Sequence, residues 1–297
     1  MTTRYASRID PDAIVALDMH VHIEADGHGH FSLDQRLLDA SAAYFKAGTD
    51  RTPTLERVAA YYRERQMAAV VFTVDAGTAR GHPPLSSAEI AEGAAAHADV
   101  LIPFGSVDPL RGADAIDQAR RLVEDHGVCG FKFHPSLQAF SPNDDRHYPL
   151  WAALAELGVP ALFHTGQTGI GAGLPGGAGI KLRYSDPMLL DDVAADFPDL
   201  TLVLAHPSVP WVDSSLSIAT HKRNVHLDLS GWSPKYFPPQ LVRQAGTLLR
   251  HKMLFGSDYP VLTPDRWLAD FAGLDIRDEA RPLILKDNAL RLLGLRT

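Results

Sequence analysis

Eight short apolar segments recur along the chain, separated by stretches of helical character, and this alternation constrains the fold more than any other feature. The segments are 14–22, 68–75, 100–109, 128–135, 160–166, 200–208, 224–231 and 252–260. Strands that are apolar throughout are buried on both faces, which is typical of parallel sheets whose strands alternate with helices.

The intervening segments supply the helices. Apolar residues recur at helical spacing in 54–66 and 114–127, while 186–198 begins with an aspartate and ends near a proline. Eight strand–helix units in 297 residues predict an α/β fold, a single (β/α)8 TIM barrel with long βα loops and C-terminal helices. We expect one domain over residues 1–297, with an open doubly wound sheet as the alternative architecture.

The composition argues against several classes of protein. A net charge of −8 disfavours a nucleic-acid-binding surface, and no apolar run is long enough to span a bilayer. The single cysteine, Cys129, cannot form an intrachain disulfide, and the polar N-terminal segment does not read as a signal peptide. We therefore expect a cytoplasmic protein that binds neither nucleic acid nor membranes.

Six of the eight apolar segments end in polar residues that can bind metal or take part in catalysis. These residues are His20 and His22, Lys132 and His134, His164, His206, Asp228, and Asp258. Because the C-terminal ends of parallel barrel strands converge on one face, we expect these side chains to meet around one point.

The pair His20 and His22 has the spacing of two metal ligands, since residues i and i+2 of a strand point to the same side. His164 and Asp258 would complete a nitrogen and oxygen shell that suits zinc, with manganese or iron(II) as alternatives. Asp258 could also accept a proton from water activated by such an ion.

Four motifs, HxH, HTG, AHP and GSDYP, follow one another in this order, each at the end of an apolar segment. They resemble the amidohydrolase superfamily, in particular its amidohydrolase-related branch, which includes aminocarboxymuconate-semialdehyde decarboxylase. The resemblance runs from about residue 14 to the C-terminus. It implies that His20, His22, His164 and Asp258 bind a divalent metal and that His206 is a catalytic residue acting on water or substrate.

Lys132 has two interpretations under this resemblance. In binuclear members a carboxylated lysine at this strand bridges two metals, whereas in one-metal members an ammonium could hold a substrate anion or carbonyl. We favour one metal ion and a catalytic pocket ammonium. The resemblance also implies a homo-oligomer, although no motif in the sequence marks an interface.

Two long βα loops are expected at 24–53 and 166–180. The second lies in the Gly-rich stretch 165–184, which has neither a Walker nor a Rossmann spacing and which we interpret as a lid or substrate loop. Cations near it could hold a carboxylate, phenolate or phosphate. The predicted substrate-binding residues are His134, Lys181, Arg183, Tyr184 and Tyr236.

The same residues fit more than one function. In metal-assisted hydrolysis of a small carbonyl substrate, Asp258 would accept the proton of water and His206 would stabilise the oxyanion or shuttle protons. In non-oxidative decarboxylation of an aromatic or enol carboxylate, both residues would govern protonation of the carbanion. A non-catalytic metal-binding barrel is a third hypothesis.

A finer resemblance involves three stretches. FKFHPSLQAF (131–140), HTGQTGIGAG (164–173) and DLSGWSPKYFPPQLVRQA (228–245) are similar to proteins described as 4-hydroxyphenyl-β-ketoacyl-CoA hydrolases. This resemblance implies hydrolysis of a carbon–carbon bond in an aryl β-ketoacyl-CoA thioester, in the catabolism of aromatic compounds. The cations at the end of the Gly-rich stretch, Lys181 and Arg183, would then suit the phosphates of CoA.

Overall fold

The computed structural model describes residues 4–45 and 52–295. Each of the eight apolar segments contains a strand, and every neighbouring pair is parallel. The strands are β1 (Ala16–His22), β2 (Met67–Phe72), β3 (Leu101–Pro103), β4 (Phe131–Phe133), β5 (Ala161–His164), β6 (Leu202–Ala205), β7 (Val225–Asp228) and β8 (Met253–Leu254).

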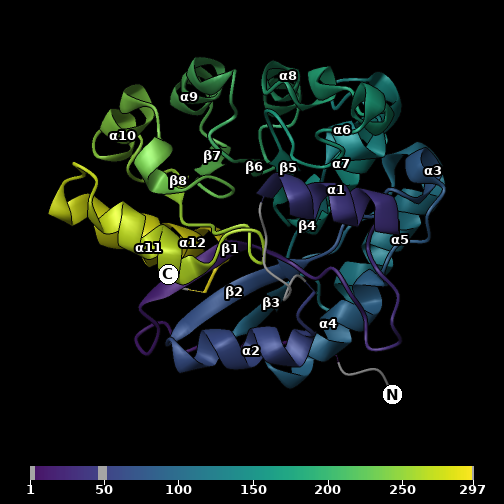
Figure 1. Cartoon of the computed structure of the whole chain (residues 1–297), viewed down its shortest axis with the longest axis horizontal. Helices are drawn as coiled ribbons and strands as arrows, with labels where there is room; N and C mark the ends of the chain where they lie inside the picture. The colour runs from purple at the N-terminus through teal and green to yellow at the C-terminus, as the bar shows by residue number, and fades with distance from the viewer. Residues whose placement is uncertain (1–3, 46–51, 296–297) are drawn as a thin grey trace.

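The strands close into a ring. They pair in two sheets, β1-β2-β3 and β4-β5-β6-β7-β8, and two further contacts join the sheets. Gly105 forms a parallel bridge with Phe131 between β3 and β4, and Val21 forms one with Tyr259 between β1 and the segment after β8. This closure confirms the (β/α)8 barrel, and the open doubly wound alternative was wrong (Figure 1).

Helices surround the ring (Figure 1). Their bounds are α1 (Gln35–Phe45), α2 (Leu55–Glu64), α3 (Gly77–Arg80), α4 (Ser87–Ala96), α5 (Ala113–Glu124), α6 (Pro135–Gln138), α7 (Tyr148–Leu157), α8 (Met188–Asp196), α9 (Val212–His221), α10 (Pro239–Ala245), α11 (Pro264–Ala272) and α12 (Asn288–Leu292). Short 3₁₀ turns lie at Pro109–Arg111, Asp145–His147, Pro175–Gly179, Leu182–Ser185, Pro234–Tyr236 and Asp278–Ala280, and a π-helical turn at Leu283–Asp287. The predicted helices 54–66, 114–127 and 186–198 correspond to α2, α5 and α8.

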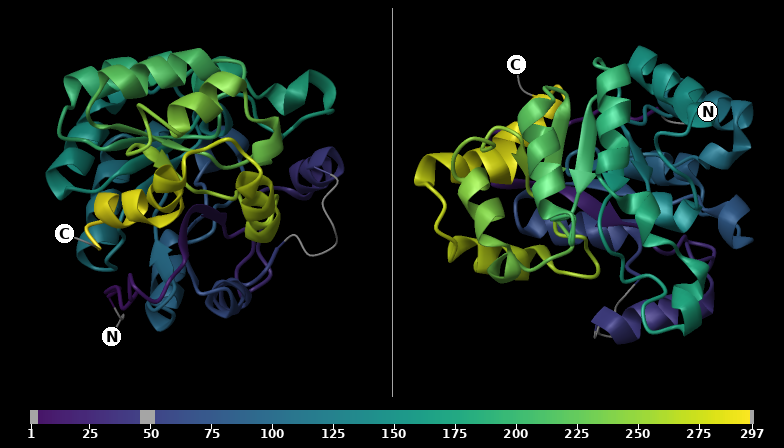
Figure 2. Two further views of the ribbon diagram at one scale, coloured as in Figure 1. Left: turned by 90° about the vertical axis from the view of Figure 1, so that its left-hand side faces the viewer. Right: turned by 90° about the horizontal axis from the view of Figure 1, so that it is seen from above.

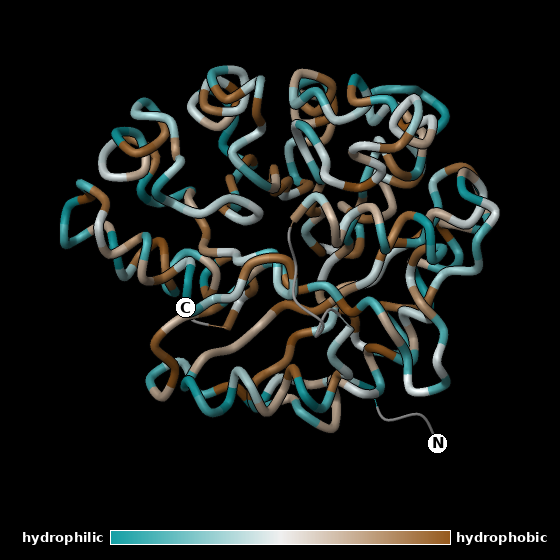
Figure 3. The backbone as a smooth tube through the Cα atoms, in the orientation of Figure 1, coloured by the Kyte–Doolittle hydropathy of each residue, from teal (hydrophilic) through white to brown (hydrophobic). Residues whose placement is uncertain are grey.

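Two layers of apolar side chains stabilise the barrel, one inside the ring and one between strands and helices. Leu162, Val203 and Leu254 belong to the inner layer, whereas Phe163 and Leu204, their neighbours along the strands, pack against the helices. Figure 3 shows the surrounding helices alternating between hydrophobic and hydrophilic residues. Within residues 4–45 and 52–295, no helix has the length and apolar character needed to cross a bilayer.

A β-bulge in β1 precedes the predicted metal ligand His22 and includes His20. Asp18 pairs with Ala69 and Val21 with Val71, so Met19 and His20 together stand opposite the single residue between these partners. A bulge of this kind re-aims the side chains that follow it. The unpaired N–H of His20 donates instead to the Asp18 carboxylate, at 3.0 Å.

The segment 24–53, which we expected to be a loop, contains α1, with residues 46–51 outside the described part of the chain. Leu33 and Leu37 pack in a small cluster with Ile170 and Leu174 of the Gly-rich stretch. Figure 2 shows α1 projecting from the body of the barrel beside that stretch. The two long βα loops therefore cover the same side of the barrel mouth.

Candidate metal centre

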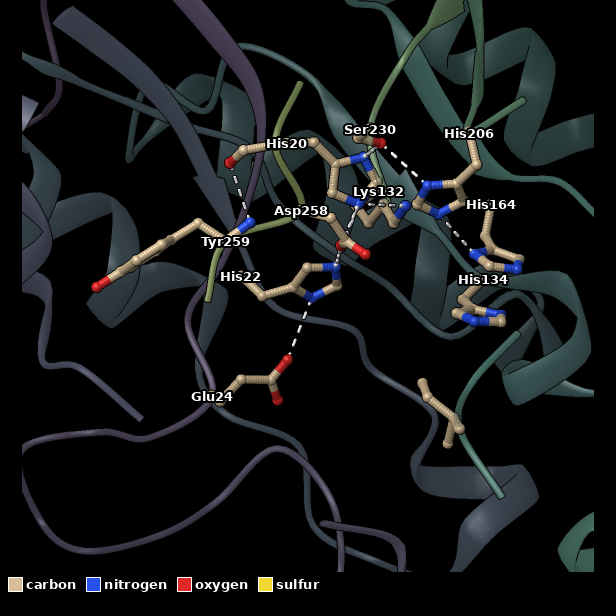
Figure 4. Close-up of polar contacts among 12 residues, drawn as sticks. His20, His22, Glu24, Lys132, His134, His164, His206, Ser230, Asp258 and Tyr259 are labelled. Atoms are coloured by element: carbon tan, nitrogen blue, oxygen red, sulfur yellow. Dashed lines mark hydrogen bonds and ion pairs between the residues drawn. The ribbon is translucent and has the colours of Figure 1, made fainter. Parts of the chain in front are cut away.

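His20 and His22 of β1 meet Asp258, which follows β8, at one point of the barrel mouth (Figure 4). The two histidine Nε2 atoms are 3.2 Å apart, and Asp258 Oδ1 lies 3.3 Å from Nε2 of His20 and 3.2 Å from Nε2 of His22. Ligands of a tetrahedral zinc ion are about 3.3 Å from one another. The three atoms therefore have the spacing that one ion requires, and they form the one such group among the described residues.

A carboxylate lies at the other ring nitrogen of each histidine. Nδ1 of His20 is 2.6 Å from Oδ2 of Asp228, and Nδ1 of His22 is 3.3 Å from Oε1 of Glu24. Glu24 holds a proton on Nδ1 of His22, whereas burial raises the pKa of Asp228 to about 8, so Asp228 and Nδ1 of His20 share one proton. With these protons on Nδ1, both Nε2 atoms face Asp258. Metal-ligating histidines are commonly oriented in this way.

The electrostatics of the group favour a cation between His22 and Asp258. Burial lowers the pKa of His22, but Asp258 and Glu24 outweigh it and raise that pKa to about 9. Burial raises the pKa of Asp258, but its hydrogen bond with His22 and the charges of His22 and Lys132 bring the net pKa below its usual value. The carboxylate is therefore ionised and shares its Oδ1 with a proton or a metal ion.

A hydrogen-bonded chain fixes the tautomers of two further histidines. Ser230 Oγ donates to the Asp228 carboxylate at 2.8 Å, so it accepts from Nδ1–H of His206 at 3.0 Å. Burial lowers the pKa of His206 to about 4, so this ring is neutral, and its Nε2 accepts from Nδ1–H of His164 at 2.9 Å. Nε2 of His164 keeps a lone pair, and this buried atom has no hydrogen-bond partner.

An unpaired buried acceptor such as His164 Nε2 needs a metal ion or a substrate donor to satisfy it. This orphaned atom and the three-residue group together fit a bound divalent metal. His164 itself does not belong to that group, so its role as a fourth ligand remains a prediction.

Lys132 and His134 reach the same mouth from β4. Nζ of the fully buried Lys132 lies 3.3 Å from Nε2 of His20, and burial lowers the lysine pKa to about 7. The ring of His134 stacks on His164 with 3.8 Å between centroids. Its Nδ1 accepts from the N–H of Leu137 at 3.2 Å, so its Nε2–H donates to Oγ1 of the pocket residue Thr168 at 3.3 Å.

His206 and Asp258 both adopt the left-handed backbone region, with φ of 72° and 71°. Non-glycine residues enter this region at a cost of about 1–2 kcal/mol, and such residues cluster at functional sites. Gly231 lies against both side chains. A Cβ at this position would stand 2.5 Å from Nδ1 of His206 and 3.2 Å from Oδ2 of Asp258, so a glycine is required.

A pocket of about 640 Å³ opens above this group. This volume is typical of small-molecule sites. Its walls include the apolar side chains Phe31, Leu33, Tyr44, Ile170, Trp232 and Leu262, and its charged lining residues are Glu24, Asp39, Asp258 and Arg266. The pocket therefore offers a mainly apolar wall and places its reactive groups at the floor.

The predicted substrate-binding residues fall into two sets. His134 and Tyr236 line this pocket, whereas Lys181, Arg183 and Tyr184 are not part of its lining. Lys181 and Arg183 are exposed, and the guanidinium of Arg183 packs over the ring of Tyr184 at 5.0 Å. The 3₁₀ turn Leu182–Ser185 carries these side chains outside the cavity.

The structure adds residues to which the sequence reasoning assigned no role. Asp18 accepts from the backbone N–H groups of His20 and Ser257, and Glu24 and Ser230 hold the histidine rings. A signal was present, because Asp18 and Glu24 continue the period-two pattern of His20 and His22 in both directions. Regular alternation would place these side chains on one side of an extended strand. In the structure a bulge follows Asp18, and Glu24 lies beyond the end of β1.

The fold is a parallel barrel, and histidines, a lysine and an aspartate meet at the C-terminal ends of its strands. Together these features are typical of one class of barrel enzymes. The chain belongs to the amidohydrolase family, whose model, described as amidohydrolase, matches residues 18–295. No curated protein matches the chain.

Solved structures share the fold. A TIM-barrel protein of Bordetella bronchiseptica, described as uncharacterized, is 25% identical with a TM-score of 0.77, covering 94% of this chain and 98% of its own. A dihydroxybenzoic acid decarboxylase of Polaromonas sp. JS666 with bound manganese and 2-nitroresorcinol is 17% identical, with a TM-score of 0.68 and coverages of 96% and 98%. A protein of Acinetobacter baumannii described as a probable 2-pyrone-4,6-dicarboxylic acid hydrolase is 15% identical, with a TM-score of 0.62 and coverages of 95% and 100%.

We expect the two carboxylates that contact the histidine rings, Asp228 and Glu24, to affect metal binding to different extents. We expect Asp228→Asn to weaken metal binding by about 10–100-fold, the range for partners that orient ligands. Glu24→Gln should have a smaller effect, because Glu24 lies 3.3 Å from its histidine and is 20% exposed, against 2.6 Å and 0% for Asp228. Competition with a chromogenic chelator measures both dissociation constants. Equal effects, or the reverse order, would contradict this interpretation.

Proposed function

We propose that the protein is a metal-dependent hydrolase that adds water to the carbonyl carbon of a small, largely apolar substrate. One divalent ion, zinc in the first instance with manganese or iron(II) as alternatives, would be held by His20, His22 and Asp258, with His164 as the fourth ligand. The observation that carries the proposal is the spacing of 3.2–3.3 Å among three ligand atoms at the floor of an apolar pocket.

A divalent ion bound there would polarise the substrate carbonyl and lower the pKa of water. The residues around it supply the proton transfers. Asp258 is ionised and accepts the proton of the attacking water, then delivers it to the leaving group. His206 keeps Nδ1–H on Ser230 and takes or releases a proton at Nε2, after the substrate displaces the Nδ1–H of His164 from that atom. Lys132 lies fully buried beside His20, and in its protonated form, with a pKa of about 7, it would stabilise negative charge that develops on the substrate oxygen.

The apolar wall of the pocket supports an aryl carbonyl substrate, and the sequence resemblance specifies an aryl β-ketoacyl thioester. Water would add to the ketone, the bond between the ketone carbon and the α-carbon would break, and the enolate would take up a proton. The products are an aryl carboxylate and an acetyl thioester. Binding of the CoA part by the exposed cations Lys181 and Arg183 remains a prediction.

Decarboxylation of an aromatic or enol carboxylate is the second candidate. The similarity in fold to a dihydroxybenzoic acid decarboxylase supports it, as the similarity to a protein described as a pyrone dicarboxylic acid hydrolase supports hydrolysis. In this reaction Lys132 would hold the carboxylate and His206 would protonate the carbanion.

The first experiment measures metal content by plasma emission on the purified protein and on the His20→Ala and Asp258→Ala variants. We expect about one ion per chain in the wild type and a loss of that ion in both variants, because each variant removes one of the three clustered ligand atoms. About two ions would instead indicate a carboxylated Lys132 that bridges two metals. No ion after reconstitution would contradict the proposal.

The second experiment separates the reactions. The metal-loaded protein is assayed with aryl β-ketoacyl-CoA thioesters, their truncated thioester analogues and phenolic acids. Aryl carboxylate release supports hydrolysis, and CO₂ release from phenolic acids supports decarboxylation. Bound metal without turnover on any of them would favour a non-catalytic metal-binding barrel.

A further inference from the structure

The candidate ligands lie where the barrel closes, on β1 and on the segment after β8. Strand β8 pairs with β7 only at Met253 and Leu254, so Asp258 lies beyond the paired part of its strand. Three backbone bonds tie this segment to β1: Met19 N–H donates to the carbonyl of Phe255 at 2.9 Å, Asp258 N–H to that of His20 at 2.9 Å, and His22 N–H to that of Tyr259 at 2.8 Å. We call this junction the β1–β8 seam.

The side chain of Tyr259 points away from the metal ligands (Figure 4) and lies between two adjacent tyrosines of α2. Tyr61 stacks on it with 5.2 Å between centroids and an interplanar angle of 23°. Tyr62 meets it edge-on, at 6.3 Å and 89°. Stacked and edge-to-face arrangements are both favourable for aromatic pairs. Tyr259 is 9% exposed, so these rings enclose the residue that follows Asp258.

Each of the two tyrosines is held by a further polar contact. The hydroxyl of Tyr62 donates to Oδ2 of Asp18 at 2.7 Å, and Asp18 also accepts from Ser257 Oγ and from the N–H groups of His20 and Ser257. Asp18 thereby joins β1, the end of β8 and α2 behind the ligands.

Tyr61 is fixed from the other side of the seam by α11. Its hydroxyl donates to Oδ2 of Asp265 at 2.8 Å, and the Arg65 guanidinium carbon lies 3.6 Å above its ring. Arg65 Nε lies 2.9 Å and 3.0 Å from the two carboxylate oxygens of Asp265. The three side chains thus connect α2 to the first turn of α11, which begins shortly after Asp258.

We propose that Tyr61 and Tyr62 are positioning residues of the metal centre, which clamp the β1–β8 seam and so set the distance between the histidine pair and Asp258. This inference rests on the proposed function in one respect, namely that an ion binds at these residues. Metal sites require ligands held within about 0.5 Å of their productive positions, so a looser seam lowers affinity without removing any ligand.

The test compares three substitutions at Tyr61 and Tyr62 with a matched control. Tyr61→Leu removes the stacking ring and the hydroxyl, whereas Tyr61→Phe keeps the ring, and Tyr62→Phe removes only the bond to Asp18. The control is Tyr148→Leu: this half-buried tyrosine of α7 also donates to an aspartate, Asp196, at 2.9 Å, and packs edge-on against a ring, that of Phe197, at 5.1 Å.

The readouts are the dissociation constant for Mn²⁺, from the electron paramagnetic resonance signal of free Mn²⁺, and the melting temperature without added metal. We expect Tyr61→Leu to raise Kd roughly tenfold, the lower end of the range for groups that orient ligands. Tyr62→Phe should raise it by a smaller factor, and Tyr61→Phe should stay within about threefold of the wild type, because the stack is kept. Tyr148→Leu should lower the melting temperature comparably and leave Kd unchanged.

A Kd for Tyr61→Leu within twofold of the wild type, or an equal rise in Tyr148→Leu, would overturn the inference while leaving the metal site intact. A wild type that binds no Mn²⁺ or Zn²⁺ would instead overturn the proposed function. Since melting temperatures are measured on the same samples, a variant that unfolds is recognised, and Tyr62→Phe then provides the test.

Discussion

Replacing His206 with asparagine is expected to lower kcat by about 10²–10⁴-fold, the range for loss of a positioned acid–base group, at saturating metal. The neutral ring of His206 lines the pocket next to Gly231, and its Nε2 can accept a proton from the substrate once the substrate replaces the Nδ1–H of His164 as its hydrogen-bond donor. It does not belong to the three-residue ligand group. Metal stoichiometry should therefore stay at the wild-type value while turnover falls.

Asparagine is the suitable replacement because His206 has a φ of 72°, and asparagine tolerates the left-handed region better than most residues. The matched control is His30→Gln, which changes an exposed histidine of the long loop after β1 and should leave kcat unchanged. Turnover within about tenfold of the wild type in His206→Asn would show that the proton transfers run through other groups.

The barrel could be predicted from the sequence because its strands are buried on both faces and are therefore apolar throughout. Phe131, Leu162 and Val203 are fully buried. The short segments that contain them are apolar without alternating polar residues, and this pattern indicated strands covered on both faces. The side chains at the ends of these strands could be predicted for a topological reason, since parallel strands bring their C-terminal ends to one face.

The partners of the ligands could not be predicted in the same way, because they depend on tertiary geometry. The bond from Asp228 to His20 spans the interior of the ring, and the contact of Ser230 with His206 requires that Gly231 lack a side chain. The orientation of a loop also could not be predicted from the sequence. Lys181 and Arg183 lie at the end of the Gly-rich stretch in the sequence, yet the 3₁₀ turn Leu182–Ser185 carries them outside the pocket.

Replacing Asp258 with asparagine is expected to have the largest effect of any single substitution. Loss of a partner that only orients a ligand weakens metal binding by about 10–100-fold, so loss of the anionic ligand itself should exceed about 100-fold. The φ of 71° is again compatible with asparagine, so the backbone of the mouth should be preserved. The control is Asp39→Asn, the same substitution at an exposed carboxylate of the same pocket, which should change the metal affinity little.

Saturating metal separates the two roles of Asp258. When excess Mn²⁺ restores occupancy in Asp258→Asn, turnover should remain at least about 10²-fold below the wild type, because an amide cannot accept the proton of the attacking water. Recovery to within about threefold of the wild type would instead show that Asp258 acts only as a ligand. The proton would then have to go to His206, and a pH profile of kcat in the His206→Asn variant would reveal that dependence. The oxygens of Asp258 are suited to both roles, since Oδ1 faces the two histidines and Oδ2 lies on the side of Gly231 and His206.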